Sequence, residues 1–372
     1  MIPLHQPFIS GNEIKYIEEV IKSRNLSGNG KFTNLCHQFL QQEFNFDYVK
    51  LTDSCTAALD MVSILLNISP GDEVIVPSYT YITSANPFVL KGAKIVYADS
   101  LSDNPNIDPA QLPKLFTEKT KVIVVMHYGG IACEMDEIME IANSHNIYVV
   151  EDAAHSLGAT YKNRFLGSIG HFGAFSFHTT KNVTSGHGGL LVINDEQFYE
   201  RAEIIWEKGT NRKMFLDGEV NKYEWYDVGL SFYPSEITAA FLWAQLQNLL
   251  MINAERLKSW DYYYEVLKNI PQIKLLEVKD YSLHNAHLFC LKTPNREKRN
   301  ILICELKNNG IMATFHYLPL HLSPYAKTEN TIKLKEAEDW ADSLVRIPLY
   351  YDIRTEDQDF IIQKIKSIVQ NW

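Results

Sequence analysis

Residues 121–151 read KVIVVMHYGGIACEMDEIMEIANSHNIYVVE and contain a complete unit of alternating secondary structure. Short runs rich in β-branched residues at 121–126 and 147–151 predict two strands, and the segment at about 134–145 predicts a helix between them. Consecutive strands joined through a helix pair in parallel, because the crossover returns the chain to the same end of the sheet. The unit therefore predicts an α/β fold with a mostly parallel sheet.

The same alternation extends toward the N-terminus. Runs at 73–77 and 94–98 (EVIVP and KIVYA) predict further strands, and the apolar spacing over 12–24 predicts an amphipathic helix. Toward the C-terminus the composition changes to short strands and helices. We therefore expect a large domain over residues 1–250 and a smaller α+β domain over 251–372.

The overall composition argues against several classes of protein. Of the 372 residues, 46% are hydrophobic and 22% are charged, and the net charge of −10 disfavours general nucleic-acid or membrane-surface binding. No run reaches the roughly 18 apolar residues that span a membrane, and the first residues lack the pattern of a signal peptide. The five cysteines are scattered without a CxxC pair, so we expect reduced thiols, no metal site and a cytoplasmic location.

Polar segments follow three of the predicted strands. PSYTYITSAN starts at residue 77, HYGG comes after 126, and EDAAHS starts at 151. Because ligands of parallel α/β sheets gather at the carboxyl ends of the strands, we expect the chemistry of this protein at these three places.

A lysine inside GAFSFHTTKN (173–182) is the central candidate for catalysis. Taken alone, Lys181 would be an ordinary solvent-facing loop residue. The glycines of the TSGHGG segment that follows, however, would let a flat cofactor approach the backbone, and the amine could then bond to it covalently. Ser176 and Thr180 add hydroxyls that suit a nearby phosphate.

Asp152 lies at the end of a predicted strand, upstream of Lys181. It could cap a following helix, or its carboxylate could pair with a protonated pyridine nitrogen, the role that acids have beside pyridoxal phosphate. Because strand residues alternate in direction, Glu151 would point to the opposite face and is not a candidate.

Three residues at the start of the predicted helix at 54–67, Ser54, Cys55 and Thr56, are candidates for a phosphate site. Hydroxyls and amides at a helix N-terminus suit an anion, although they also serve as simple N-caps, and the two roles are compatible. Tyr81 follows a strand end and would either stack on a flat ring or fill the core.

Taken together, these motifs resemble the DegT/DnrJ/EryC1/StrS aminotransferases, fold type I enzymes that aminate nucleotide-linked keto sugars. The likeness covers nearly the whole chain. The segments AEIIWEKGTNRKMF, KYEWYDVGLSF and ITAAFLWAQLQ are most similar to the branch that makes dTDP-4-amino-4,6-dideoxygalactose. The remaining likeness is carried by PFISGNEIKYIEEVIKSRNLSGNGKFT, GDEVIVPSYTYITSAN, GAKIVYAD, HYGGIACEMDEI, EDAAHSLGATY, GAFSFHTTKN, INAERL, FHYLPLHLSPY and RIPLYYDI.

The resemblance implies a fold, a cofactor and a set of contacts. The large domain would hold a mostly parallel seven-stranded sheet and bind pyridoxal 5'-phosphate, and two chains would form a homodimer with active sites at the interface. Lys181 would form the internal aldimine and shuttle the proton, while Asp152 would hold the ring nitrogen. The other cofactor contacts would be Ser54, Cys55, Thr56 and Ser176 at the phosphate, Tyr81 on the ring, and His155, where relatives often carry glutamine, at the ring hydroxyl.

Three features depart from the family pattern. Cys55 stands where relatives have glycine, which is tolerable if only its backbone amide is used. GLSFY (229–233) replaces G-x-N-x-R, whose asparagine reaches the cofactor phosphate of the neighbouring subunit, so Ser231 would make that contact with its hydroxyl. The TSGHGG loop is one residue shorter than in the dideoxygalactose branch and carries His187 in place of a glutamate.

Four further residues in family-like stretches are candidates for holding a pyrophosphate or the carboxylates of the amino donor. Arginine pairs well with planar anions, and histidine can donate hydrogen bonds to them. Each could equally be an ordinary surface or structural residue. The candidates are His178, Arg212, His316 and His321.

The reaction that the resemblance implies has two halves. L-glutamate leaves as 2-oxoglutarate after giving its amino group to the cofactor, and pyridoxamine 5'-phosphate passes that group to C4 of dTDP-4-keto-6-deoxyglucose, for surface polysaccharide synthesis. Amination at C3 of a 3-keto-6-deoxyhexose and a non-catalytic, cofactor-binding regulator are the alternatives. Relatives that deoxygenate sugars have histidine in place of the lysine, so Lys181 argues against that chemistry.

Overall fold

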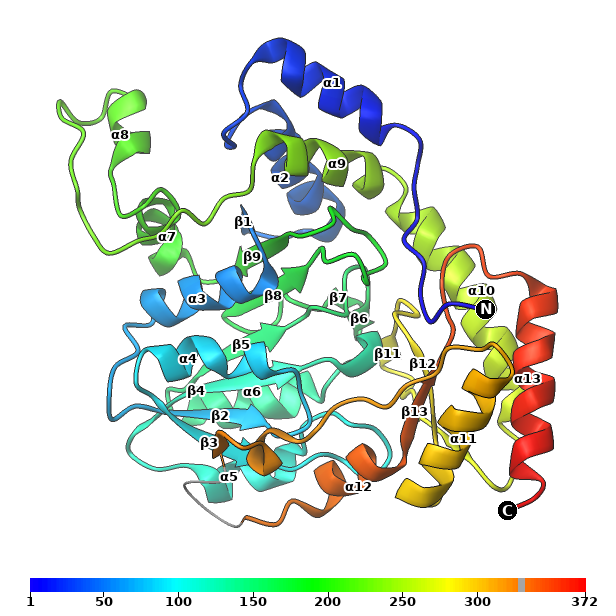
Figure 1. Cartoon of the computed structure of the whole chain (residues 1–372). Coiled ribbons are helices and arrows are strands. Elements are labelled where there is room, and N and C mark those ends of the chain that lie inside the picture. Colours follow the sequence, from blue (N-terminus) through cyan, green and yellow to red (C-terminus); the bar gives the residue numbers. More distant parts are fainter. Residues whose placement is uncertain (327–331) are drawn as a thin grey trace.

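The computed structural model describes residues 1–326 and 332–372, and its centre is one seven-stranded sheet (Figure 1). The strands lie in the order β1-β9-β8-β5-β4-β2-β3. Neighbours from β8 to β3 are parallel, and β9 runs antiparallel to both β8 and β1, so the predicted mostly parallel sheet is confirmed. The strands of this sheet are β1 (Tyr48–Thr52), β2 (Glu73–Pro77), β3 (Lys94–Ala98), β4 (Thr120–Met126), β5 (Tyr148–Asp152), β8 (Phe172–Ser176) and β9 (Gly189–Ile193).

Two smaller sheets, each of three strands, accompany the large one. Their orders are β10-β12-β13 and β11-β6-β7. The strands are β6 (Thr160–Tyr161), β7 (Arg164–Phe165), β10 (Lys274–Leu275), β11 (Ser282–Leu283), β12 (Phe289–Lys292) and β13 (Leu344–Ile347).

Helices connect the strands, and within the described ranges none is long and apolar enough to cross a membrane. They are α1 (Glu13–Ser23), α2 (Lys31–Phe44), α3 (Cys55–Leu65), α4 (Asn86–Leu90), α5 (Leu112–Leu115), α6 (Met135–Ser144), α7 (Tyr199–Trp206), α8 (Arg212–Leu216), α9 (Glu236–Leu246), α10 (Leu249–Leu267), α11 (Arg296–Asn308), α12 (Lys335–Ser343) and α13 (Thr355–Val369).

Both faces of the large sheet are buried. On β4, Val122 and Val124 pack with side chains of α3, α4 and α7, whereas Ile123 and Val125 pack with α5 and α6. A strand that is buried on both faces has no polar side to show. This explains why 121–126 reads as a continuous β-branched run rather than an alternating one.

The C-terminal part has its own core, in which β12 and β13 pack with α11 and α13. The first residues of the chain lie against this part, since Ile2 pairs with Ile311 and the amide of Leu349 donates to the carbonyl of Leu4. The predicted domain boundary at residue 250 stays a prediction, because α10 runs across it.

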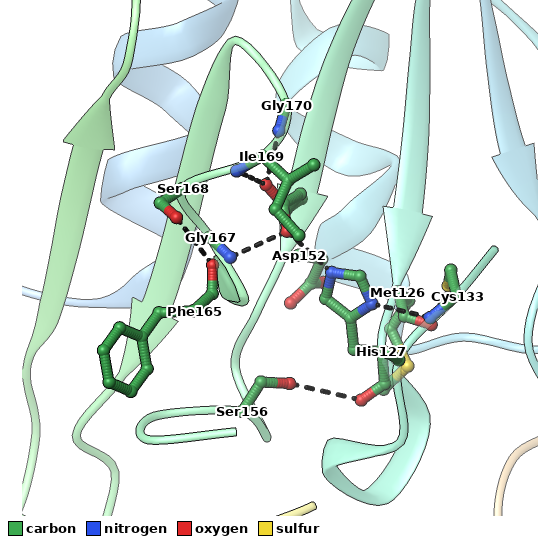
Figure 2. A network of polar contacts seen from close by, with 12 residues as sticks. Met126, His127, Cys133, Asp152, Ser156, Phe165, Gly167, Ser168, Ile169 and Gly170 are labelled. Carbon is green, nitrogen blue, oxygen red and sulfur yellow. Dashed lines mark hydrogen bonds and ion pairs between the residues drawn. The ribbon is translucent and has the colours of Figure 1, made fainter. Parts of the chain in front are cut away.

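A buried carboxylate ties the end of β5 to the loop before β8 (Figure 2). Glu151 accepts hydrogen bonds of 2.6–2.7 Å from three backbone amides of residues 167–170, and Nε2 of His127 lies 2.9 Å from it. Nδ1 of His127 accepts the amide of Cys133 at 3.1 Å, so Nε2 carries a proton and donates it to Glu151. Glu151 is therefore used in hydrogen bonds that hold the fold. The side chain of Asp152, the next residue of the strand, points to the opposite face of the sheet and is available there.

Changing Glu151 to glutamine should lower the free energy of unfolding by about 2–4 kcal/mol, because an amide nitrogen would replace an acceptor of buried backbone donors. Urea unfolding of the purified variant measures the loss. Glu18→Gln is the matched control, since Glu18 pairs with Lys22 at the exposed surface and should change the free energy by less than about 0.5 kcal/mol. Equal stability of the two variants would contradict the prediction.

Candidate active site

A cavity of about 570 Å³ lies at the carboxyl ends of the parallel strands. Its wall includes Tyr81 after β2, Met126 of β4, Asp152 of β5 and Ser176 of β8, together with Lys181. The three strand ends that the sequence marks as candidates for chemistry therefore meet at one place, as the direction of parallel strands requires.

Lys181 lies in the turn after β8, where its amide donates to the carbonyl of His178 at 2.9 Å. Burial disfavours the charged amine and lowers the pKa of Lys181 to about 8; the charge of Arg346 adds to this effect, and Cys55 and Asp152 oppose it. Near pH 8 a large fraction of the amine is therefore neutral, as a nucleophilic or proton-transferring lysine requires.

Asp152 is only 4% exposed and is held by hydrogen bonds. The hydroxyl of Ser84 donates to Oδ2 at 2.6 Å, the amide of Ala154 donates to Oδ1 at 3.2 Å, and Ser84 contacts the hydroxyl of Thr80 at 2.8 Å. Burial raises the pKa of Asp152, and these hydrogen bonds and the charge of Lys181 oppose the rise. A carboxylate in such a place is well suited to pair with a cation such as a protonated ring nitrogen.

The N-terminus of α3 gives the same cavity a site for an anion. Ser54, Cys55 and Thr56 line the cavity. The side chain of Ser54 accepts the amide of Ala57 at 3.0 Å, and the amides of Cys55 and Thr56 have no partner within the helix and are available to a ligand. A Cβ on Gly189 would lie 2.2 Å from the backbone of Ser54, so only glycine lets β9 pass this close to the turn.

Tyr81, Ser176 and His155 also line the cavity, as the predicted cofactor contacts require. Tyr81 is 54% exposed, with its ring 6.1 Å from that of Tyr317, so it does not belong to the core. Nδ1 of His155 accepts the amide of Gly129 at 3.2 Å, which leaves the proton on Nε2. The structure brings these side chains together, and the contact of each with a cofactor stays a prediction.

Ser231 and Arg212 do not line the cavity of their own chain. Arg212 begins α8, which projects from the rest of the chain (Figure 1), whereas Ser231 lies where the chain returns from this projection. Ser231 forms an isolated bridge with Glu207, and Nη1 of Arg212 lies 3.5 Å from the carboxylate of the same residue. The contact expected of Ser231 is with a neighbouring subunit, so it stays a prediction, and a substrate contact of Arg212 would also require a partner's cavity.

Among the histidines expected to hold substrate, His178 and His316 line the cavity, and His321 does not. His321 is buried, with Nδ1 2.6 Å from the hydroxyl of Ser78 and Nε2 3.4 Å from Glu338. Both of its ring nitrogens are engaged within the fold. His321 therefore holds its own segment against the end of β2 rather than facing a ligand.

Residues that the sequence does not single out also line the cavity, among them His5, His287, Tyr317 and Arg346. His5 comes from the N-terminal segment and the others come from the C-terminal part, so tertiary packing alone brings them to the strand ends. Arg346 is the one that the sequence could have indicated. It is the only charged residue in the otherwise apolar strand LVRI (344–347), and a charge in such a strand requires a partner.

The ring of His287 lies against that of His155, with centroids 4.2 Å apart and the planes tilted by 31°. Its Nδ1 lies 3.0 Å from Oδ1 of Asn182, whose amide nitrogen already donates to Asn253, so Nδ1 of His287 carries the proton and Nε2 is an acceptor. Burial lowers the pKa of both imidazoles and keeps them neutral. The two rings therefore contribute one N–H donor and one acceptor beside Lys181.

Comparison with known proteins finds similarity along the whole chain. A sequence model of the DegT/DnrJ/EryC1/StrS aminotransferase family matches residues 7–366. The spore coat polysaccharide biosynthesis protein SpsC of Bacillus subtilis is 31% identical, over 99% of this chain and 97% of SpsC. GDP-perosamine synthase of Escherichia coli O157:H7 is 29% identical over 98% of each chain. Spr1654 of Streptococcus pneumoniae, solved in its pyridoxamine-phosphate form, superimposes with a TM-score of 0.93, 27% identity and full coverage of both chains.

Proposed function

The chain belongs to the DegT/DnrJ/EryC1/StrS aminotransferase family, and on that premise we propose that it moves an amino group from L-glutamate to a keto-deoxysugar carried by a nucleotide. It is a pyridoxal-phosphate-dependent aminotransferase, whose bound cofactor would carry the amino group in its pyridoxamine form between the two halves of the reaction. The observation that carries the proposal is the meeting of Lys181, Asp152 and the N-terminus of α3 at one cavity.

The residues of the cavity fit this cofactor. The amides of Cys55 and Thr56 and the hydroxyl of Ser176 suit its phosphate, and the buried carboxylate of Asp152 suits its ring nitrogen. Tyr81 is available to lie against the ring. When bound, the cofactor supplies an electron sink for the negative charge that develops at the reacting carbon.

Two side chains carry the proton chemistry in this proposal. Nζ of Lys181, with a pKa of about 8, takes the α-proton of the amino donor in the first half and returns a proton to the sugar carbon in the second. The carboxylate of Asp152 holds a positive charge at the ring nitrogen through both halves. The amide of Gly129 occupies Nδ1 of His155, so Nε2–H would be the donor to the ring hydroxyl.

For the acceptor we propose C4 of dTDP-4-keto-6-deoxyglucose, within surface polysaccharide synthesis. The similarity to SpsC, a spore coat polysaccharide protein, and to GDP-perosamine synthase supports a nucleotide-linked sugar in such a pathway. Amination at C3 of a 3-keto sugar is the competing assignment. The presence of Lys181 supports amination over removal of a hydroxyl.

We also propose a homodimer whose active sites lie at the interface. α8 projects from the rest of the chain (Figure 1), and the residues between α8 and Ser231 expose large apolar side chains, among them Trp225 at 83% and Leu230 at 58%. In a dimer this segment would reach the partner's cavity, where Ser231 would meet the cofactor phosphate.

All five cysteines are free thiols, which supports a reducing, cytoplasmic location.

A titration of the aminated enzyme tests the acceptor. The enzyme is converted to its pyridoxamine form with L-glutamate, freed of 2-oxoglutarate, and titrated with dTDP-4-keto-6-deoxyglucose, its GDP-linked counterpart and a dTDP-3-keto-6-deoxyhexose. We expect the dTDP-linked 4-keto sugar to restore the absorption of the aldehyde form, and nuclear magnetic resonance of the product to show nitrogen at C4. Recovery with the 3-keto sugar alone would contradict the C4 assignment, and recovery with simple 2-oxo acids but no sugar would contradict the proposed function.

A further inference from the structure

Arg346 lines the cavity but has no role in the proposed cofactor contacts or proton transfers. It projects from β13 into the cavity wall, and its Nη1 lies 2.8 Å from Nε2 of His316. A guanidinium only donates, so Nε2 of His316 accepts, and Nδ1–H of the same ring donates to the hydroxyl of Tyr128 at 2.9 Å. These two contacts fix the place of the guanidinium, but they bring no negative charge to it.

The charge of Arg346 is not compensated by the described part of the chain. No carboxylate there forms an ion pair with it, and its Nε is buried without an acceptor. Arg256, also buried and nearby, differs because it donates to the carbonyls of Ala286, His287 and Leu349. A partly buried cation that faces a cavity and lacks a counter-ion favours an anionic ligand there.

The proposed reaction brings several anionic groups into the cavity, and the position of Arg346 indicates which of them it binds. The cofactor phosphate has its own site at the N-terminus of α3, and Asp152 is the carboxylate that serves the ring. Arg346 lies near enough to Lys181 for its charge to lower the pKa of that amine. In an amino donor the α-carboxylate is attached to the same carbon as the reacting nitrogen, whereas a sugar ring separates the pyrophosphate of a nucleotide sugar from C4.

We propose that Arg346 binds the carboxylate of the amino donor and of the 2-oxo acid that it becomes, with His316 holding the guanidinium in place. This inference rests on the proposed function, since it assigns a ligand to the same cavity. It gives Arg346 the role for which the sequence offered Arg212, which lies outside the cavity.

Two half-reactions, measured separately by rapid mixing, test the assignment. In Arg346→Gln we expect the apparent Kd for L-glutamate to rise about 10- to 100-fold, because a hydrogen-bonded charge pair is lost, and the apparent Kd for the nucleotide sugar to stay unchanged. Arg346→Lys keeps the charge without the planar fork and should give an intermediate loss. Arg354→Gln, at an exposed arginine paired with Asp357, is the matched control.

A binding measurement without turnover completes the test. Calorimetric titration of the holoenzyme with glutarate, a dicarboxylate that cannot react, should show the same weakening in Arg346→Gln and none in Arg354→Gln. Unchanged affinity for L-glutamate and glutarate would overturn the proposal, and so would an equal loss for the nucleotide sugar, which would assign Arg346 to the pyrophosphate. The glutarate titration involves no sugar, so it tests Arg346 independently of the acceptor. If every nucleotide sugar failed to react, the proposed function would be refuted, but the glutarate titration would still show whether Arg346 binds a carboxylate.

Discussion

Lys181→Ala should reduce the rate of both half-reactions by about 10⁴-fold or more, because it removes the nucleophile and the proton carrier together. The variant should still bind the cofactor through the α3 amides and Asp152, but borohydride reduction followed by peptide mass spectrometry should find no adduct at position 181. Lys258→Ala, at an exposed lysine paired with Glu255, is the matched control and should keep the native rate. Native turnover by Lys181→Ala would refute the enzymatic assignment.

The lowered pKa of Lys181 predicts the pH dependence of cofactor attachment. An ordinary lysine has a pKa near 10.4, but burial and Arg346 lower that of Lys181 to about 8. Only the neutral amine attacks an aldehyde, so the rate at which the apoenzyme is covalently loaded should rise with pH and level off above about pH 8. A rate that still rises through pH 10 would show that the amine behaves like an exposed lysine.

The sequence predicts the parallel sheet and the core of the site for a physical reason. Each strand ends where a β-branched run gives way to polar residues, and parallel strands place such ends on one edge. Asp152 and Lys181 are distant in sequence, yet they meet because β5 pairs in parallel with β8, with Asp152 opposite Ala174. The composition of the strand ends, together with the rule that parallel strands end on one edge of the sheet, is therefore enough to predict the sheet and the meeting of Asp152 with Lys181.

The rest of the cavity depends on packing that local sequence does not encode. His316 and His321 lie five residues apart in one motif, yet one lines the cavity and the other is buried against Ser78. Nothing in FHYLPLHL separates them, because the difference comes from the partner that each ring meets in the fold. His287 and Arg346 likewise reach the cavity only through the docking of the C-terminal part.

Asp152→Asn should lower the rate of both half-reactions by about 10²- to 10⁴-fold while the cofactor stays attached to Lys181. The amide has nearly the same shape and can still accept from Ser84, so the cavity should keep its form. It carries no charge, however, and cannot hold a proton on the ring nitrogen. The electron sink therefore weakens although the covalent bond to the lysine does not, and absorption spectra of the purified variant separate the two effects.

Ser84→Ala provides a graded comparison at the same carboxylate. It removes one hydrogen bond of 2.6 Å to Asp152 and leaves the charge, so we expect a loss of about tenfold, the worth of one hydrogen bond. The order native, Ser84→Ala, Asp152→Asn should hold in both half-reactions, because the ring nitrogen is used in each. If Asp152→Asn slowed only the sugar half, the carboxylate would be acting on the substrate, and the ring nitrogen would need another partner.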